Sequence, residues 1–133
     1  ESALTLMKWL KQQTEFVQVL HPADPDCAGH QYWNEICSEG HSAGLVSVIF
    51  DAKFSFEDIR HFCDALTLFK LGFSWGGPVS LVMLYNLKDM RVLEHSHLKH
   101  GFLVRFCIGL EHPQDLIQDI QYALEHMKKP KNE

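Results

Sequence analysis

The sequence predicts an α+β fold in which a mainly antiparallel sheet is covered by helices on one face. Three observations favour this class: short apolar runs typical of strands, helical apolar periodicity at both ends of the chain, and one further helix between strands. The 133 residues suffice for one hydrophobic core. With 46% hydrophobic and 22% charged residues, the composition is that of an ordinary globular domain.

Three segments have the periodicity of amphipathic helices. The middle one begins at Ser55, whose hydroxyl can cap the helix, and Glu57 and Asp58 occupy the first turn, where the helix dipole favours acids. Pro113 suits the start of the last helix, and Pro130 its end. The expected buried stripes are Ala3, Leu6, Met7 and Leu10; then Ile59, Phe62, Cys63 and Leu66; then Leu116, Ile117, Ile120, Leu124 and Met127.

Strands are expected where apolar residues cluster between turn signals, at residues 16–20, 44–50, 69–73, 79–85 and 103–108. One or two helical turns are expected at residues 31–37, and loops at 21–26 and 86–101. No apolar run approaches the roughly 18 residues that span a bilayer, and no export signal is visible. These observations favour a soluble, cytoplasmic protein, although a chain starting without Met in a helical pattern is expected to be a fragment.

The net charge and the positions of the cysteines bear on nucleic-acid binding and on disulfide formation. The net charge of −5 argues against nucleic-acid binding, which selects a basic face. Cys63 lies on a helical apolar stripe and Cys107 within an apolar strand, so both are expected to be buried thiols. Cys27 and Cys37 flank a short segment and could pair, but nothing else indicates an oxidising compartment.

Arg105 lies in the middle of an apolar strand. Side chains alternate along a strand, so Arg105 points away from the core side on which Val104 and Phe106 are expected. An unpaired buried charge is costly, so Arg105 must meet an anion or open onto a cleft. The anion is either an internal acid, such as Glu111, or the carboxylate of a ligand, which the planar guanidinium can bind through two hydrogen bonds.

The segment 74–77, Ser-Trp-Gly-Gly, follows another predicted strand. Its glycines allow positive φ or close approach, and a hydroxyl and free amides at such a turn can hold an anion. The alternative is a plain turn with a buried Trp75. The spacing of His95, His97 and His100 could bind a metal, but the loop has no third soft ligand, so no metal site is expected.

Two elements carry a family resemblance: residues 71–77, Leu-Gly-Phe-Ser-Trp-Gly-Gly, and residues 104–111, Val-Arg-Phe-Cys-Ile-Gly-Leu-Glu. Together with the His21-Pro22-Ala23 loop and the helix at 115–120, they resemble the C-terminal domain of the pyridoxal-phosphate (PLP) enzymes of cysteine and methionine metabolism. The likeness covers essentially the whole chain. Trp75 favours the cystathionine β-lyases of that family, whereas Pro78-Val79 departs from its more usual aromatic and acid.

The resemblance implies that Arg105 binds the α-carboxylate of an amino-acid thioether such as L-cystathionine, with Ser74 and Trp75 lining the same pocket. It implies α,β-elimination to homocysteine, pyruvate and ammonia. Residues 1–133 would be a single substrate-binding domain without catalytic, cofactor-binding or metal-binding residues, inactive alone. Pyridoxal 5'-phosphate and its Schiff-base lysine would belong to the enzyme's own N-terminal domain, absent from this chain. The parent would be a cytoplasmic homotetramer in methionine biosynthesis and transsulfuration.

Two alternatives stay open on the sequence. One is a stand-alone α+β module that binds a small carboxylate ligand or an acidic residue of a partner through Arg105, with Trp75 in its core. A natural N-terminus at Glu1 would favour it. The other is a sister PLP enzyme, a γ-lyase or γ-synthase, which shares the chemistry of the site. Neither substrate preference nor the assembly of the chain follows from the sequence.

Overall fold

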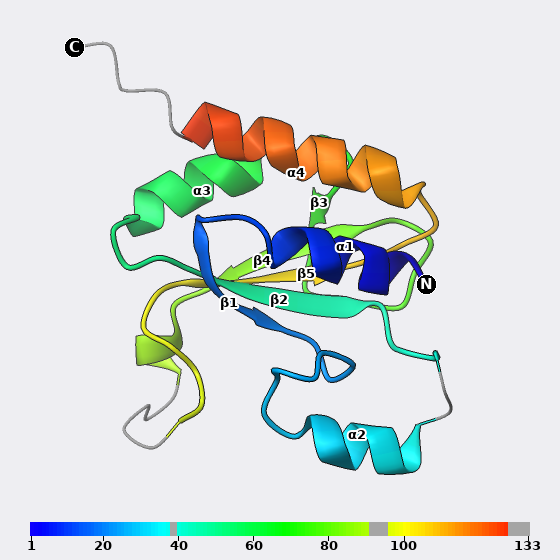
Figure 1. The fold of residues 1–133 in the computed structure, drawn as a ribbon. Helices are drawn as coiled ribbons and strands as arrows, with labels where there is room; N and C mark the ends of the chain where they lie inside the picture. The colour runs from blue at the N-terminus through cyan, green and yellow to red at the C-terminus, as the bar shows by residue number, and fades with distance from the viewer. Residues whose placement is uncertain (38–39, 91–95, 128–133) are drawn as a thin grey trace, which may run out of the picture.

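The protein, seen in a computed structural model that describes residues 1–37, 40–90 and 96–127, is built on one five-stranded sheet (Figure 1). The strands run in the order β1-β2-β5-β4-β3. Neighbouring strands are antiparallel except β3 and β4, which are parallel. The mainly antiparallel sheet is therefore confirmed. The strands are β1 (Phe16–Leu20), β2 (Leu45–Phe50), β3 (Lys70–Leu71), β4 (Leu81–Tyr85) and β5 (Leu103–Cys107).

Helices cover one face of this sheet, as the sequence predicted. In Figure 1, α1 (Ser2–Leu10), α3 (Phe56–Ala65) and α4 (Pro113–Met127) lie above the sheet, whereas α2 (His30–Ile36) lies below it. Helix α2 has no buried residue, so it contributes little to the core. None of the helices in the described ranges is long and apolar enough to cross a membrane.

The core lies between the sheet and helices α1, α3 and α4. Each of these helices supplies its predicted stripe, and the strands supply alternate side chains, because only every second residue of a strand faces the helices. The fully buried members include Leu6, Leu10, Val46, Val48, Phe50, Ile59, Phe62, Val82, Val104, Phe106, Leu116 and Ile120. Cys63 and Cys107 are also buried, as predicted.

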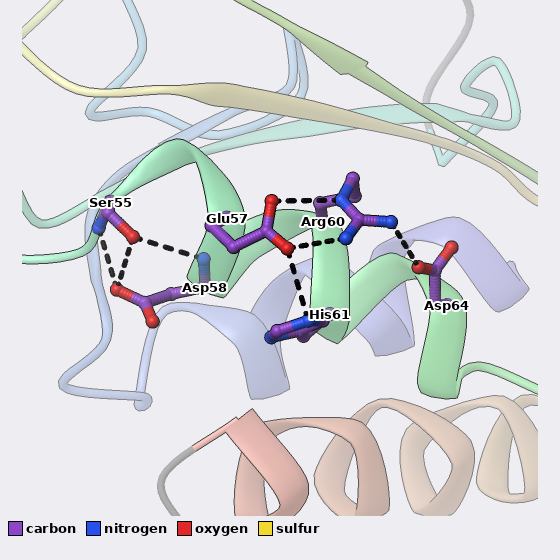
Figure 2. Close-up of polar contacts among 6 residues, drawn as sticks. All are labelled: Ser55, Glu57, Asp58, Arg60, His61 and Asp64. Carbon is purple, nitrogen blue, oxygen red and sulfur yellow. Dashed lines mark hydrogen bonds and ion pairs between the residues drawn. The ribbon is translucent and has the colours of Figure 1, made fainter. Parts of the chain in front are cut away.

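The start of α3 follows the predicted capping. The hydroxyl of Ser55 accepts a hydrogen bond from the Asp58 amide at 3.2 Å, and the Asp58 carboxylate accepts one from the Ser55 amide at 2.8 Å. This reciprocal pair is a capping box, and it satisfies backbone amides that no helical carbonyl can reach. Figure 2 shows it beside the exposed face of α3, where Arg60 lies between Glu57 and Asp64.

A buried carboxylate ties α4 to the segment that leads into β3. Asp119 is only 7% exposed, although it is charged. One of its oxygens accepts hydrogen bonds from the amide and hydroxyl of Thr67, both at 2.8 Å. The other accepts from the amides of Leu68 at 2.9 Å and Phe69 at 3.3 Å. These bonds satisfy the carboxylate and fix where the chain enters the sheet edge.

Three expectations need correction or comment. The strand predicted at 69–73 is only Lys70–Leu71, because from Gly72 onward the carbonyls turn toward Arg105. The loop predicted at 86–101 contains a short 3-10 turn, Leu87–Asp89, and residues 91–95 fall outside the described part of the chain. Cys27 and Cys37 are both free thiols, so the possible disulfide does not form.

Candidate functional site

Arg105 occupies the centre of β5, which is the central strand of the sheet. Its strand neighbours are Ser47 on β2 and Met83 on β4. The adjacent residues Val104 and Phe106 are fully buried under the helices, so Arg105 lies on the opposite face, which α1, α3 and α4 do not cover. The alternation predicted from the sequence is therefore confirmed.

The guanidinium of Arg105 is held by backbone carbonyls. One terminal nitrogen, Nη2, donates to the carbonyl of Phe73 at 2.8 Å and, over longer distances, to those of Ser74 at 3.3 Å and Gly72 at 3.4 Å. The Nε atom is buried and has no hydrogen-bond partner within the described residues. A buried donor without a partner is costly, which marks Arg105 as a group whose interactions are incomplete.

No acid neutralises Arg105 among residues 1–37, 40–90 and 96–127. The internal ion pair with Glu111, one of the two expectations, is wrong: the Glu111 carboxylate accepts hydrogen bonds from the amide and hydroxyl of Ser80 instead, at 2.8 and 2.7 Å. Because three neutral carbonyls leave its positive charge uncompensated, Arg105 is suited to bind an anion from outside the described chain.

Two aromatic rings flank the guanidinium. The Cζ atom of Arg105 lies 5.8 Å from the ring centroid of Trp75 and 5.8 Å from that of Tyr85, within range of cation–π attraction. Trp75 is 64% exposed, so the alternative that places this indole in the core is wrong. Tyr85 was not expected at the site. Spacing alone puts Tyr85 on the same face of β4 as Met83, and the pairing of β4 with β5 then brings that face to Arg105.

Residues 72–80, called loop 72–80 below, carry the predicted Ser-Trp-Gly-Gly turn. Gly76 has φ of 78°, which confirms the expected use of a glycine for positive φ. The Gly76 amide donates to the sulfur of Cys107 at 3.3 Å, so the turn is held to β5. The side chain of Ser74 is exposed, and the contact of Ser74 with Arg105 is made by its backbone carbonyl.

A hollow of about 330 Å³ adjoins this turn. The residues that line it include Trp75, Gly76, Gly77, Cys107 and Gly109. The hollow therefore shares Trp75 with the surroundings of Arg105. In the described ranges, no group of three or more His, Cys, Asp or Glu side chains could hold a metal; His95, part of the histidine cluster considered above, lies outside those ranges.

Comparison with known proteins identifies the family. The model of the Cys/Met metabolism PLP-dependent enzymes matches residues 1–125. The chain belongs to this family. The expectation drawn from the 71–77 and 104–111 segments is thus confirmed, and the fold agrees, since its structural neighbours are fold-type-I PLP enzymes.

Relatives within the Cys/Met metabolism family include several activities. The chain is 41% identical over 125 residues to a cystathionine β-lyase of Bordetella avium, covering 92% of this chain and 30% of that protein. It is 29% identical over 129 residues to a cystathionine γ-lyase of Dictyostelium discoideum, covering 94% of this chain and 32% of the relative. A solved structure of a putative O-acetylhomoserine (thiol)-lyase from Campylobacter jejuni, bearing a pyridoxyl-lysine group, superposes with a TM-score of 0.74 at 25% identity.

The length of these matches bears on what the chain contains. The chain spans about 30% of the curated β-lyase and 27% of the C. jejuni structure, while 93% of the chain is covered in the latter match. The whole of this fold therefore corresponds to one part of a longer family member. The part that this chain represents includes Arg105, Trp75 and loop 72–80.

Proposed function

We propose that residues 1–133 form the C-terminal, substrate-binding domain of a PLP-dependent cystathionine β-lyase. The proposed reaction is the α,β-elimination of L-cystathionine to homocysteine, pyruvate and ammonia. Arg105 binds the α-carboxylate, and Trp75 and Ser74 line the same pocket. The observation that carries the assignment is a guanidinium at the centre of the sheet, with no acid paired to it in the described chain and with Nε unpartnered.

The chemistry of the donor set supports a carboxylate as the ligand. A carboxylate can accept two parallel hydrogen bonds from one guanidinium, and its negative charge supplies what three neutral carbonyls cannot. The Trp75 and Tyr85 rings limit where the guanidinium can turn, since both lie 5.8 Å from Cζ. Arg105 would then hold the amino acid in a fixed orientation, which is a positioning contribution to the reaction rather than a bond-making one.

The cofactor is proposed to be held by the longer parent enzyme rather than by this chain. In the described ranges, the hydrogen bonds of Arg105 go to backbone carbonyls and none joins a lysine to Arg105, Ser74 or Trp75. Lys11, for example, is paired with Asp24 at 2.7 Å, and the Lys70 ammonium donates to the carbonyl of Thr67 at 2.7 Å. Pyridoxal phosphate, once bound, supplies an electron sink at the α-carbon, and the residues of this chain bind and orient the substrate beside it.

Exposed apolar side chains around loop 72–80 support a partner surface here. Soluble domains seldom leave large apolar groups uncovered together, and such patches usually mark contact surfaces. We assign this surface to the enzyme's own N-terminal PLP domain, because the relatives extend well beyond the part that this chain matches. The exposed residues are Leu71 (63%), Phe73 (70%), Trp75 (64%), Val79 (48%) and Leu110 (85%).

A sister reaction is the second candidate, and the similarity to the D. discoideum γ-lyase favours keeping it. The two reactions differ in their keto-acid product: β-elimination of cystathionine gives pyruvate, and γ-elimination gives 2-oxobutyrate. Incubating the full-length parent enzyme with L-cystathionine and identifying the keto acid separates them. The stand-alone module is disfavoured by family membership over residues 1–125 and by the exposure of Trp75.

Arg105→Leu in the full-length parent tests the carboxylate assignment. Since a hydrogen bond to a charged group contributes roughly 1.5–3 kcal/mol, loss of a two-bond contact should lower kcat/KM by about a hundredfold or more. The cofactor absorbance should be retained. Arg60→Leu is the matched control, because Arg60 is an exposed arginine on α3 that pairs with Glu57 and Asp64, and it should leave kcat/KM unchanged (Figure 2). Unaltered kinetics in Arg105→Leu would refute the assignment.

A further inference from the structure

Loop 72–80 is held along β5 and the residues that follow it. The Arg105 guanidinium donates hydrogen bonds to carbonyls at the start of the loop, and the sulfur of Cys107 accepts one from the amide of Gly76 in its middle. Past the end of the strand, the amide of Leu110 donates to the carbonyl of Pro78 at 2.8 Å. The path of the loop is thus set by contacts spaced along one neighbouring segment.

A further contact, between Ser80 at the end of the loop and Glu111, uses more hydrogen bonds than the others. The two carboxylate oxygens of Glu111 accept from the amide and the hydroxyl of Ser80, at 2.8 and 2.7 Å. The hydroxyl of Ser80 in turn accepts from the amide of Gly109 at 2.9 Å. Ser80 is fully buried, and its carbonyl accepts from the Lys70 amide at 3.0 Å. Every polar group of Ser80 is therefore satisfied, and its position is fixed from both sides.

Gly109 allows the two segments to approach this closely. A Cβ atom at Gly109 would lie 2.7 Å from the Ser80 amide nitrogen and 2.7 Å from a Glu111 oxygen, and would overlap the carbonyl of Pro78. Such distances are too short for any larger residue unless the backbone moves. The hydrogen bonds between Ser80 and Glu111 thus depend on a site where only glycine fits.

Burial alone would raise the pKa of Glu111, but the hydrogen bonds from the Ser80 amide, the Ser80 hydroxyl and its own amide outweigh it and lower the pKa below its usual value. Glu111 is therefore ionised at neutral pH and accepts through both oxygens. A charged carboxylate makes stronger hydrogen bonds than a neutral one, which suits a contact that must hold a loop end in one place.

We propose that Ser80 and Glu111 are positioning residues for the carboxylate site, an inference that rests on the proposed function. By fixing the end of loop 72–80, the pair sets where the carbonyls of Phe73 and Ser74 lie, and these carbonyls orient the guanidinium of Arg105. The loop has only five residues between Ser74 and Ser80, so a displacement at Ser80 is transmitted to the Arg105 contacts.

A double-mutant cycle in the full-length parent enzyme tests this, using Glu111→Gln, Arg105→Leu and the combination. Glutamine keeps the shape of the side chain but presents an amide group to one of the two Ser80 donors. We expect Glu111→Gln to lower kcat/KM by about tenfold, mainly through KM, less than the roughly hundredfold that a 1 Å misplacement can cost. In the Arg105→Leu background the same change should have less than about a twofold effect, because the positioned group is gone.

A second measurement reports the conformation of loop 72–80 independently of catalytic activity. With fluorinated tryptophan incorporated, the resonance lost in Trp75→Phe is that of Trp75, and Glu111→Gln should shift it while leaving those of Trp9 and Trp33 in place. Ser80→Ala is the milder variant, because it keeps the amide bond to Glu111 and loses only the hydroxyl bonds, and it should shift the same resonance by less.

The capping box of α3 supplies the matched control. Ser55 and Asp58 make the same serine–carboxylate contact, with the Ser55 amide and hydroxyl both 2.8 Å from one Asp58 oxygen, but away from loop 72–80 (Figure 2). Ser55→Ala should leave KM and the Trp75 resonance unchanged. Equal effects of Glu111→Gln with and without Arg105, or an unmoved Trp75 resonance, would overturn the positioning role. If Arg105→Leu alone has no effect, the proposed function fails, and this inference fails with it.

Discussion

Asp119 offers the sharpest test of how this fold is held together. Its carboxylate is 7% exposed and accepts four hydrogen bonds from three consecutive residues, Thr67, Leu68 and Phe69. Asp119→Asn keeps the shape of the side chain but replaces one acceptor oxygen with an NH₂ group. That group faces either the amides of Leu68 and Phe69 or the amide and hydroxyl of Thr67. Only the hydroxyl can turn and accept from it, so at least one hydrogen bond is lost and the NH₂ group is brought against an N–H donor.

The expected cost follows from the lost hydrogen bond and from the weaker bonds that a neutral amide makes with the remaining donors. Hydrogen bonds to a charged group contribute about 1.5–3 kcal/mol each, so Asp119→Asn should lower the free energy of unfolding by about 3 kcal/mol. Urea denaturation of the 133-residue chain, followed by circular dichroism, gives this value by linear extrapolation. Hydrogen exchange should also quicken at the amides of Leu68 and Phe69.

Asp115→Asn is the control for the Asp119 substitution. Asp115 lies one turn earlier on α4, is exposed, and interacts with the helix dipole rather than with buried donors. Its replacement should change the free energy of unfolding by less than about 1 kcal/mol. If Asp119→Asn costs no more than Asp115→Asn, the four hydrogen bonds do not stabilise the fold as argued, and the entry of the chain into β3 must be fixed by apolar packing alone.

Three further predictions concern single residues. Burial, with a smaller contribution from Asp64, raises the pKa of Cys63 to about 12, so at pH 8 iodoacetamide should modify exposed Cys37 and leave Cys63 intact until the chain unfolds, as peptide mass spectrometry would show. The lowered pKa of Glu111 implies a stabilising contribution that is complete above the ordinary pKa of 4.5 and is lost as the pH falls through the lower folded value. Glu111→Gln should therefore reduce the pH dependence of the free energy of unfolding in urea over that acid range. An unchanged pH profile would contradict the argument. Gly76→Ala should cost about 1–2 kcal/mol of unfolding free energy, because φ is 78° there. Gly77→Ala, at a position equally open but without positive φ, should cost almost nothing, and equal losses would rule out backbone strain as the cause.

Local pattern in the sequence was sufficient for most of the elements. The apolar stripe of α4 and the alternation along β5 are properties of consecutive residues, and both are found as predicted. The Ser55 cap is likewise local, since it joins residues three positions apart. The same reasoning placed Arg105 on the face opposite Val104 and Phe106, because alternation does not depend on which strands are neighbours.

Contacts that depend on strand order could not be predicted in this way. Glu111 was one of the candidate partners for Arg105, six positions away, but it bonds to Ser80, which lies 31 residues earlier. That contact exists because β4 and β5 are neighbours, and the sequence does not state the order of strands. Tyr85 was missed for the same reason: only the pairing of β4 with β5 brings its ring to Arg105.

The length of β3 was overestimated because apolar composition continues past its end. Residues 69–73 have the character of a strand, but only Lys70 and Leu71 pair with β4. The next carbonyls are drawn to the charged Arg105 side chain, which competes with the sheet for them. A charged side chain on a neighbouring strand therefore accompanies the early end of β3, which composition alone does not reveal.

The two edge strands of the sheet, β1 and β3, limit how this chain can associate with other molecules. Strand β3 offers a neighbour only two residues of backbone, and β1, at the other margin, has an irregular register between Phe16 and Gln18. Long, regular outer strands are the ones that recruit foreign strands and seed aggregates, and bulges or short strands prevent this. Any association of this chain should therefore proceed through side-chain surfaces, such as the one around loop 72–80, rather than by extension of the sheet.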